Sequence, residues 1–259
     1  MSNVTLFCNA SGIPEPLVSW VNVHNDQLTP GKTLVFENIT RHQAGEWRCE
    51  ASNPCGNATE SATIDVQFKP EMVQLVPSET TACLGDYIMF NCSANSNPAV
   101  HTYQLYVNGM MVNETSTTGI WNRTMTTSGE FVYKCMVNNS VGTAMSTIVT
   151  VTVNVPSFIQ PIADEMIIEG GNLTLTCNAS GFPTPTVSWV KTSNGQLTNG
   201  TELVLTNVGR DQAGEYRCEA TNLCNTATDL ATVNVLCKFL AIQLCVRCSR
   251  TEGIATLKS

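Results

Sequence analysis

Hydrophobic and polar residues alternate in short runs along much of this 259-residue chain, the pattern of β-strands with one buried face. Two of the clearest runs, residues 4–8 and 173–177, each end in a cysteine. Proline, glycine and asparagine interrupt the runs at spacings of roughly eight to twelve residues, as in β-sandwiches. The pattern therefore predicts an all-β protein.

The chain contains a long internal duplication. An offset of 169 residues aligns residues 3–66 with residues 172–235 without a gap, and 38 of the 64 positions are identical. Each copy has a strand ending in cysteine, a proline-bearing turn followed by a tryptophan (Trp20 or Trp189), a second apolar strand and a second cysteine. Self-similarity of this kind is the mark of a repeated structural unit.

A third, diverged copy lies between the other two. An alternating run leads into Cys92, and Tyr133 precedes Cys135 by two residues. Leu105 stands where the other copies have tryptophan, and Gly129 lies four residues before the aromatic residue instead of two. We therefore expect the middle core to contain less aromatic area and its corner to bend differently.

The second cysteine of each duplicated copy closes a distinctive motif. Residues 211–218 read D-Q-A-G-E-Y-R-C, and residues 42–49 read H-Q-A-G-E-W-R-C. This is the form of a tyrosine corner, at which strand F of an immunoglobulin sandwich begins. In the first copy Trp47 occupies the place of the tyrosine, so we expect its indole N–H to replace the phenol hydroxyl.

These motifs resemble the intermediate-type and C2-type immunoglobulin domains of animal cell-adhesion and matrix proteins, such as hemicentins and carcinoembryonic-antigen-related adhesion molecules. The resemblance covers residues 3–236 and implies three tandem immunoglobulin-like β-sandwiches. Residues 157–171 have no counterpart before Asn3, so the first sandwich is expected to lack its A strand. The expected domains are residues 1–68, 69–155 and 156–236, followed by a tail of unrelated sequence, residues 237–259.

The resemblance also implies how six of the twelve cysteines pair. Strand positions B and F give the pairs Cys8–Cys49, Cys92–Cys135 and Cys177–Cys218. Each bridge would close a loop of about forty residues and would contribute roughly 4 kcal/mol in the chain-entropy model.

Four other cysteines lie in turns or at the end of the third repeat. Cys55 and Cys224 occupy matching F–G turns, and Cys83 lies in the A–B turn of the middle copy. In a linear array these two kinds of turn meet, so we predict an interdomain disulfide, Cys83–Cys224, which requires Cα atoms within about 7 Å. Cys55 would pair with a preceding domain, remain a free thiol or form an intermolecular bridge. Cys237 belongs with Cys245 and Cys248 of the tail, which include one C-x-x-C and too few ligands for zinc.

Glycosylation sequons are dense. The N-x-S/T acceptors are Asn3, Asn9, Asn38, Asn57, Asn91, Asn113, Asn122, Asn138, Asn172, Asn178 and Asn199. Together with paired cysteines, they indicate an extracellular, oxidising setting, at the cell surface or secreted. We expect neither a signal peptide at Met1 nor a membrane-spanning stretch, so the chain reads as a fragment of a longer protein.

Charge and motifs argue against several functions. The net charge of -8 would repel nucleic acid and heparin, and no basic cluster offsets it. His24, His42 and His101 are scattered, and the glycines form no phosphate-binding pattern. We therefore expect no catalysis, metal or cofactor in these residues.

The sequence suggests one surface for partners. Sugars on strand B, at Asn3, Asn91 and Asn172, would cover one sheet of each sandwich. The opposite sheet offers the candidate residues Val21, Arg48, Glu50, Val190, Arg217 and Glu219. The arginine and glutamate could instead form only a weak surface ion pair.

The predicted function is adhesion or recognition of protein partners, homophilic or heterophilic, without membrane insertion. The alternatives are the ectodomain of a kinase-type or phosphatase-type receptor, or a piece of a modular extracellular enzyme.

Overall fold

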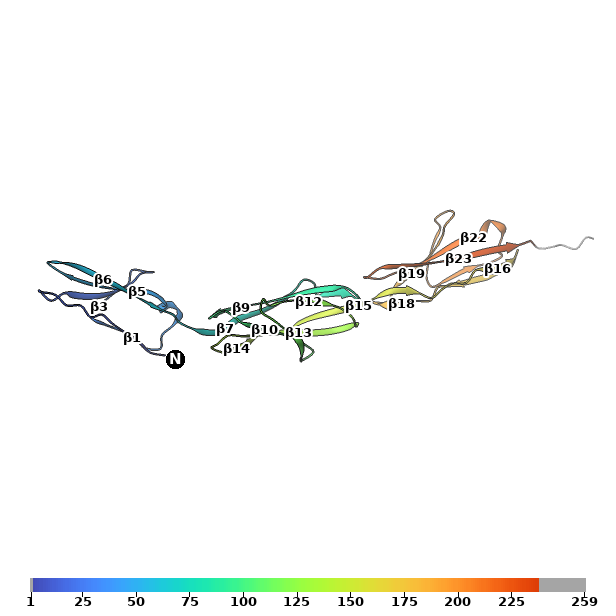
Figure 1. The fold of residues 1–259 in the computed structure, drawn as a ribbon. Helices are drawn as coiled ribbons and strands as arrows, with labels where there is room; N and C mark the ends of the chain where they lie inside the picture. The colour runs from blue at the N-terminus through green and yellow to red at the C-terminus, as the bar shows by residue number, and fades with distance from the viewer. Residues whose placement is uncertain (1, 238–259) are drawn as a thin grey trace, which may run out of the picture. The chain divides into compact units, whose positions relative to one another are not determined.

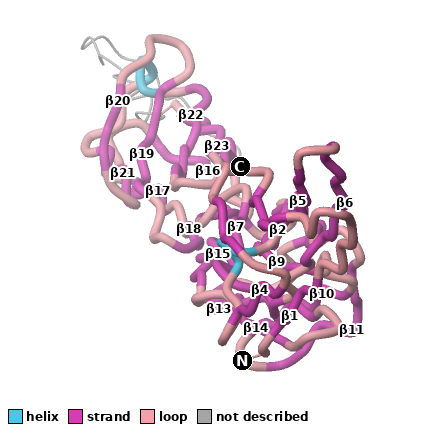
Figure 2. Tube along the Cα trace, turned by 90° about the vertical axis from the view of Figure 1, so that its left-hand side faces the viewer, coloured by secondary structure: helices cyan, strands magenta, loops and turns pink. Residues whose placement is uncertain are grey.

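The computed structural model describes residues 2–237, and nearly all of their regular structure is strand (Figure 1). Within that range, helix is limited to two single turns, η1 (Arg41–Gln43) and η2 (Arg210–Gln212), drawn in cyan in Figure 2. The strands form three tandem immunoglobulin-like sandwiches, two in the unit Met1–Val153 and one in the unit Asn154–Ser259.

The first sandwich packs a two-stranded sheet against a four-stranded one. The small sheet pairs β1 (Val4–Phe7) with β4 (Thr33–Phe36). The larger sheet has the order β3 (Leu28–Pro30), β2 (Leu17–Asn22), β5 (Gly45–Asn53) and β6 (Gly56–Ile64). Its core centres on Trp20, Phe36 and Trp47, with the Phe36 and Trp47 rings edge to face at 5.0 Å.

The second sandwich also has two sheets. One has the order β12 (Ile120–Thr124), β9 (Tyr87–Asn97) and β7 (Phe68–Pro77). The other has the order β11 (Met110–Ser116), β10 (Thr102–Val107), β13 (Gly129–Asn138) and β15 (Val149–Ile159). Two short strands, β14 (Thr143–Met145) and β8 (Thr81–Cys83), pair with β13 and β15.

The middle core is as aromatic as its neighbours, so the expectation of a less aromatic core was wrong. Leu105 does occupy the tryptophan place and is fully buried. Trp121 of β12, directly opposite Phe90 in the sheet, brings an indole into the core from the other side. The Phe90 and Tyr133 rings lie 4.3 Å apart. The aromatic area has moved to another strand and has not been lost.

The third sandwich contains two strands, β16 and β18, that have no counterpart among the described strands of the first sandwich. Its small sheet pairs β17 (Leu173–Thr176) with β21 (Glu202–Leu205). Its larger sheet has the order β16 (Glu165–Ile168), β23 (Thr226–Leu236), β22 (Gly214–Thr221), β19 (Thr186–Lys191) and β20 (Leu197–Asn199). The end of β15 pairs with β18 (Ala179–Phe182), a strand without an equivalent in the first sandwich.

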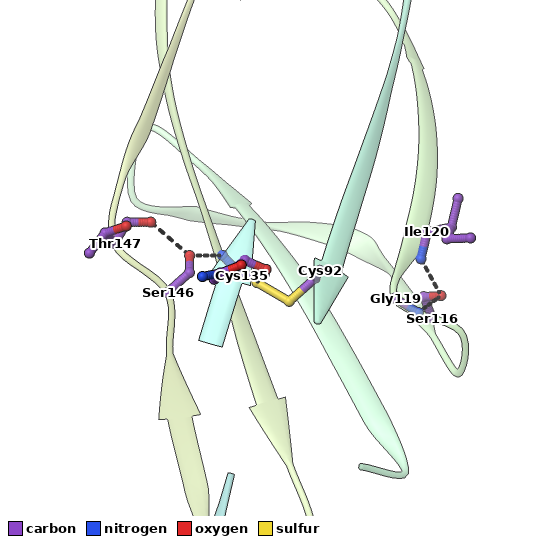
Figure 3. The surroundings of a disulfide bond; sticks show 8 residues. Cys92, Ser116, Gly119, Ile120, Cys135, Ser146 and Thr147 are labelled. Carbon is purple, nitrogen blue, oxygen red and sulfur yellow. Dashed lines mark hydrogen bonds between the residues drawn. A yellow bond between two sulfur atoms is a disulfide. The ribbon is translucent and has the colours of Figure 1, made fainter. Parts of the chain in front are cut away.

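The structure joins the three expected core pairs, Cys8–Cys49, Cys92–Cys135 and Cys177–Cys218, with Cα atoms 6.2, 6.4 and 6.4 Å apart. Figure 3 shows the middle bridge between the two sheets. Ser146 lies beside it, accepting the Cys135 N–H at 3.0 Å and donating to the Thr147 carbonyl at 2.7 Å. A hydroxyl is therefore tolerated in this core because both of its hydrogen-bonding roles are used.

Two of the three F strands begin at the predicted corner. The Tyr216 hydroxyl donates to the Gln212 carbonyl at 2.8 Å, and the Trp47 indole N–H donates to the Gln43 carbonyl at 3.0 Å. The predicted replacement of phenol by indole is confirmed. In the middle sandwich Tyr133 makes no such bond among the described residues. Gly129 still opens strand β13 with a φ of 130°, so the bend is kept while the aromatic anchor is displaced.

Candidate functional site

The predicted binding residues lie on the outward face of the larger sheet in the first and third sandwiches. In the first, β2 pairs with β5 so that Val21 is opposite Arg48 and Ser19 is opposite Glu50. Strands β3 and β6 extend these into two rows across the sheet: Leu28, Val21, Arg48 and Ser61, and Pro30, Ser19, Glu50 and Thr59. The third sandwich has the matching rows: Leu197, Val190, Arg217 and Leu230, and Asn199, Ser188, Glu219 and Thr228.

An arginine and a glutamate two residues apart form an ion pair at the centre of each face. Arg48 donates from Nε and Nη2 to Oε1 of Glu50 at 2.9 and 2.7 Å. Arg217 and Glu219 form the same pair at 2.8 and 2.6 Å. These side chains are 29–43% exposed, so each pair contributes at most about 1 kcal/mol to stability. Each ion pair places a fixed dipole on the surface and contributes little to the free energy of folding.

The valines of the predicted patch offer little surface. Val21 is 6% exposed and Val190 is half-buried. The exposed apolar members of the rows are leucines on the neighbouring strands: Leu28 and Leu197, each 59% exposed, and Leu230, 47% exposed. Strand alternation predicts the side of the sheet on which the valines lie, but it does not predict how far they are buried there.

Two sequon asparagines share this sheet with the candidate residues. Asn199 of β20 lies directly opposite Ser188, one row from Val190 and Arg217. Asn57 of β6 lies opposite Ser52, on the same face but in the next row beyond Glu50 and Thr59. Residues opposite each other in a sheet project from the same face, so a sugar on Asn199 would stand over the third patch. The first patch, with Pro30 in the equivalent place, has no sequon in its rows.

The middle sandwich carries a different outward face, which the sequence reasoning did not single out. Tyr106 of β10 lies opposite Met111 and Lys134, and the Lys134 ammonium is 5.6 Å from the Tyr106 ring centroid. Met111 and Met145 are 46% and 51% exposed. The density of methionine between residues 110 and 145 was the available signal. Flexible thioethers suit protein contact surfaces.

A recurring asparagine in the F–G turn was also missed. Asn139, 3% exposed, donates from Nδ2 to the carbonyls of Phe68 and Pro98 at 2.8 and 2.9 Å. Its Oδ1 accepts the N–H groups two and three residues further along the chain. Asn222 makes the equivalent bonds in the third sandwich. In the first sandwich Asn53 donates to the carbonyl of Pro14, which follows a cis peptide bond, at 2.7 Å. One side chain thus holds two loops and the A strand together.

The sequon asparagines are accessible. Asn138 is partly buried, and the other ten are exposed. The side-chain oxygens of Asn3 and Asn172 accept N–H groups from Asn38 and Asn207 at 3.0 and 2.9 Å. Their Nδ2 atoms, to which a sugar would be attached, are not used in these bonds.

The remaining cysteines fall into two groups. Cys83 and Cys224 are disulfide-bonded. Cys83 ends strand β8 and Cys224 lies in the F–G turn, and the backbone N–H of each donates to a side-chain acceptor, Asp86 for the first and Asn222 for the second. Cys55 and Cys237 are free and exposed. The prediction for Cys245 and Cys248 lies outside the described residues.

The three histidines lie in two separate places. His24 and His42 line one shallow hollow with Arg41 and Glu46, whereas His101 contacts the Thr102 hydroxyl elsewhere. Among residues 2–237, no three His, Cys, Asp or Glu side chains are grouped to hold a metal. No helix in that range is long and apolar enough to cross a membrane.

With the sheets, bridges and corners in place, the chain can be assigned to a family. The immunoglobulin-domain family matches residues 1–53, 69–153 and 156–222. The chain belongs to the immunoglobulin superfamily.

Curated relatives are long proteins of which the chain matches a small part. It is 28% identical to hemicentin-1 of Homo sapiens, covering 90% of this chain and 5% of that protein. It is 28% identical to the peroxidasin homolog of Homo sapiens, covering 87% and 17%. It is 27% identical to the cell adhesion molecule DSCAML1 of Gallus gallus, covering 90% and 13%. The chain therefore spans less than a fifth of each of these proteins.

A solved structure supports the fold. The I67–I69 fragment of titin superposes with a TM-score of 0.58 at 22% identity, covering 91% of this chain and 93% of the fragment. At that identity the likeness concerns the fold alone.

Proposed function

We propose that the chain is an extracellular adhesion or recognition module that binds protein partners by surface contact, through the outward face of β2 and β5 in the first sandwich. The observation that carries the proposal is the composition of that face. It combines the Arg48–Glu50 pair with the exposed Leu28, and no sequon lies in its two rows.

Four further observations support this function. Relatives include a cell adhesion molecule, and every core cysteine is paired. The accessible sequons fit a secreted or cell-surface setting. A net charge of -8 favours a protein partner over nucleic acid. In this proposal the described residues act by contact, and chemistry and cofactors have no part in it.

The physical basis is the exposed ion pair beside an apolar residue. A half-buried dipole with its remaining donors and acceptors free can be completed by a partner that presents the complementary charges. Leu28 supplies apolar area next to it, and a cluster of this kind is typical of the energetic centre of an interface. The third patch would bind only where Asn199 lacks a sugar.

The test is aggregation of beads coated with the chain, and binding of a fusion protein to cells if beads do not aggregate. Arg48→Glu with Glu50→Arg exchanges the two charges, so it keeps an ion pair for the fold but reverses the pattern offered to a partner. We expect this double variant to lose at least about 90% of its binding to parent-coated beads or to cells, since like charges would then face each other across the contact.

The matched control is Lys32→Glu with Glu15→Lys, which reverses another exposed ion pair of the same sandwich, 2.7 Å in length. That variant should bind like the parent chain. Equal binding of the parent and the Arg48/Glu50 variant to parent-coated beads or to cells, with both folded by circular dichroism, would refute the proposed face.

We also propose that Cys83 and Cys224 form one disulfide with each other. The proposal is supported by the bonded state of both sulfurs and by the free state of Cys55, the counterpart of Cys224 in the first sandwich. Peptide mapping without reduction should recover one linked pair, residues around 83 with residues around 224. Recovery of either cysteine linked to Cys55 or Cys237 would overturn it.

A further inference from the structure

The three-stranded sheet of the second sandwich has an uncharged outward face. In one row across the sheet, Asn91 of β9 lies opposite Ile120 of β12 on one side and opposite Val76 of β7 on the other. Side chains that lie opposite each other project from the same face of a sheet, and the rows on either side of β9 alternate with it. We call the outward residues of these rows the β9 face: Val76, Tyr87, Met89, Asn91, Ile120, Asn122 and Thr124.

The β9 face has a large apolar part that is open to solvent. Its apolar side chains are 46–76% exposed and come from all three strands: Val76, Tyr87, Met89 and Ile120. In Figure 3 the Ile120 side chain points away from the Cys92–Cys135 bridge, which lies in the core. Soluble proteins seldom leave a contiguous apolar patch uncovered unless it binds something. The patch therefore needs an occupant.

The corresponding sheet of the third sandwich shows that the fold does not require this apolar surface. Strands β17 and β21 pair so that Thr174 lies opposite Val204 and Thr176 lies opposite Glu202. All four side chains are exposed, and Val204 is the one apolar residue among them. The apolar surface is thus a property of the second sandwich, where a polar face would have served the fold equally well.

Two sequon asparagines lie within the β9 face. Asn91 begins the sequence Asn-Cys-Ser, and Asn122 begins Asn-Arg-Thr. Both are exposed, and neither side-chain amide forms a hydrogen bond with any residue in the range 2–237. Asn122 lies directly opposite Met89, and Tyr87 is its diagonal neighbour on β9. Opposite residues have Cβ atoms about 4.5–5.5 Å apart, so a sugar attached at Asn122 begins beside Met89.

We propose that the oligosaccharides on Asn91 and Asn122 lie down on the β9 face and cover its apolar side chains. A pyranose ring carries C–H groups on its faces and hydroxyl groups around its edge. It can therefore pack its carbons against Met89 and Tyr87 while its hydroxyls stay in water. Removal of apolar area from water favours this arrangement over sugars that extend into solvent.

The same sugars exclude a second copy of the chain from the β9 face. Stacked sheets pack about 10 Å apart, which leaves no space for two oligosaccharides that start from the middle of one sheet. A protein partner that lies flat on the face meets the same obstacle. The occupant is therefore carried by the chain itself, and the contact proposed for the first sandwich is made elsewhere.

Oxidation of methionine by hydrogen peroxide tests the proposal, because Met89 belongs to the covered face and its rate of sulfoxide formation follows its exposure. The experiment uses the full chain secreted from animal cells, with sequon occupancy and sulfoxide measured by mass spectrometry. We expect Asn122 to be occupied and Met89 to oxidise at least about threefold more slowly than in Asn122→Gln. Met166, exposed on β16 of the third sandwich, is the internal control and should oxidise equally in both chains.

Substitutions of Thr124 separate loss of the sugar from loss of the asparagine. Thr124→Ala removes the sequon and leaves Asn122 in place, so Met89 should oxidise as fast as in Asn122→Gln. Thr124→Ser keeps the sequon and should keep the slow oxidation. Asn113→Gln removes a sequon from β11, in the other sheet, and should change the Met89 rate less than about twofold.

A methionine reporter tests the sugar on Asn91 in the same way. Val76→Met places a thioether directly opposite Asn91. This methionine should oxidise at least about threefold more slowly than the same methionine in a chain that also carries Asn91→Gln.

The proposal is overturned if Asn122 is unoccupied, or if Met89 oxidises at the same rate in the parent chain, Asn122→Gln and Thr124→Ala. Slow oxidation of Met89 that persists in Asn122→Gln, together with a dimer in light scattering, would also overturn it, because a second copy would then cover the face. None of these outcomes depends on the proposed adhesive face of the first sandwich.

Discussion

The corner hydrogen bond of the third sandwich offers a clean test of how the fold is held. Replacing Tyr216 by phenylalanine removes one hydroxyl and leaves the ring, which is 4% exposed, in place. The hydroxyl donates to the Gln212 carbonyl at 2.8 Å, a good length for this bond. The perturbation is therefore one hydrogen bond with no change in apolar burial.

The magnitude follows from the exchange of partners. A bond of this kind contributes about 0.5–1.5 kcal/mol net, because the unfolded hydroxyl bonds to water instead. Gln212 is partly exposed, so water can reach the abandoned carbonyl and the full desolvation cost does not apply. We expect Tyr216→Phe to lower the free energy of unfolding of the third sandwich by about 1 kcal/mol.

Hydrogen exchange resolved by peptide is the assay, since the three sandwiches need not unfold together. Protected amides of β19 and β22 that exchange by global opening should exchange about fivefold faster in the variant. Tyr133→Phe is the matched control, because its hydroxyl makes no hydrogen bond among the described residues, and exchange in β13 should be unchanged. Equal exchange in β22 of the parent and Tyr216→Phe would refute the account of the corner.

Three further outcomes are expected. Gly119→Ala should cost at least about 2 kcal/mol in urea unfolding, because a Cβ would lie 2.4 Å from the Cys92 carbonyl at a φ of 78°; an unchanged midpoint would contradict this. Asn139→Ala should lower the free energy of unfolding by about 2–3 kcal/mol in the same assay, and Asn53→Ala, which loses one carbonyl partner instead of two, by about 1 kcal/mol. Equal losses would show that the bonds to the two loop carbonyls are not the cause. Burial, and secondarily Asp211, raises the pKa of Tyr216. The contribution of the protonated hydroxyl to stability is therefore complete below the unfolded pKa of about 10 and is lost as the pH rises through the folded pKa. The thermal midpoint of the third sandwich should fall between about pH 9 and 11, and the fall should be smaller in Tyr216→Phe.

The repeat explains why so much of the fold was predictable. Once Cys49 and Cys218 were placed in the same motif, their partners, the tryptophan of strand C and the corner bond of Trp47 followed, because each depends on local sequence and strand order.

The rest depended on contacts between strands that are distant in sequence. Leu105 left a place in the middle core that Trp121 fills from the opposite sheet, and no local pattern links the two. The burial of Val21 depends on the side chains of neighbouring strands, and Asn199 was found to share the face of Arg217 only through the β19–β20 register. The alternation of apolar and polar residues shows which side chains of one strand face outward, whereas a binding surface is formed by side chains from several neighbouring strands.

The F–G asparagines have a consequence for the chemical ageing of the protein. Hydrolysis of the Asn139 amide would put a carboxylate against the carbonyl oxygens of Phe68 and Pro98, replacing two attractive contacts with repulsion. Burial of the amide and the use of both its atoms in hydrogen bonds hold the side chain away from the backbone nitrogen that would attack it. Asn53 is more accessible, but the following residue, Pro54, has no N–H for that reaction. Deamidation, which slowly modifies many surface asparagines, is therefore held back at the F–G turns of Asn53 and Asn139.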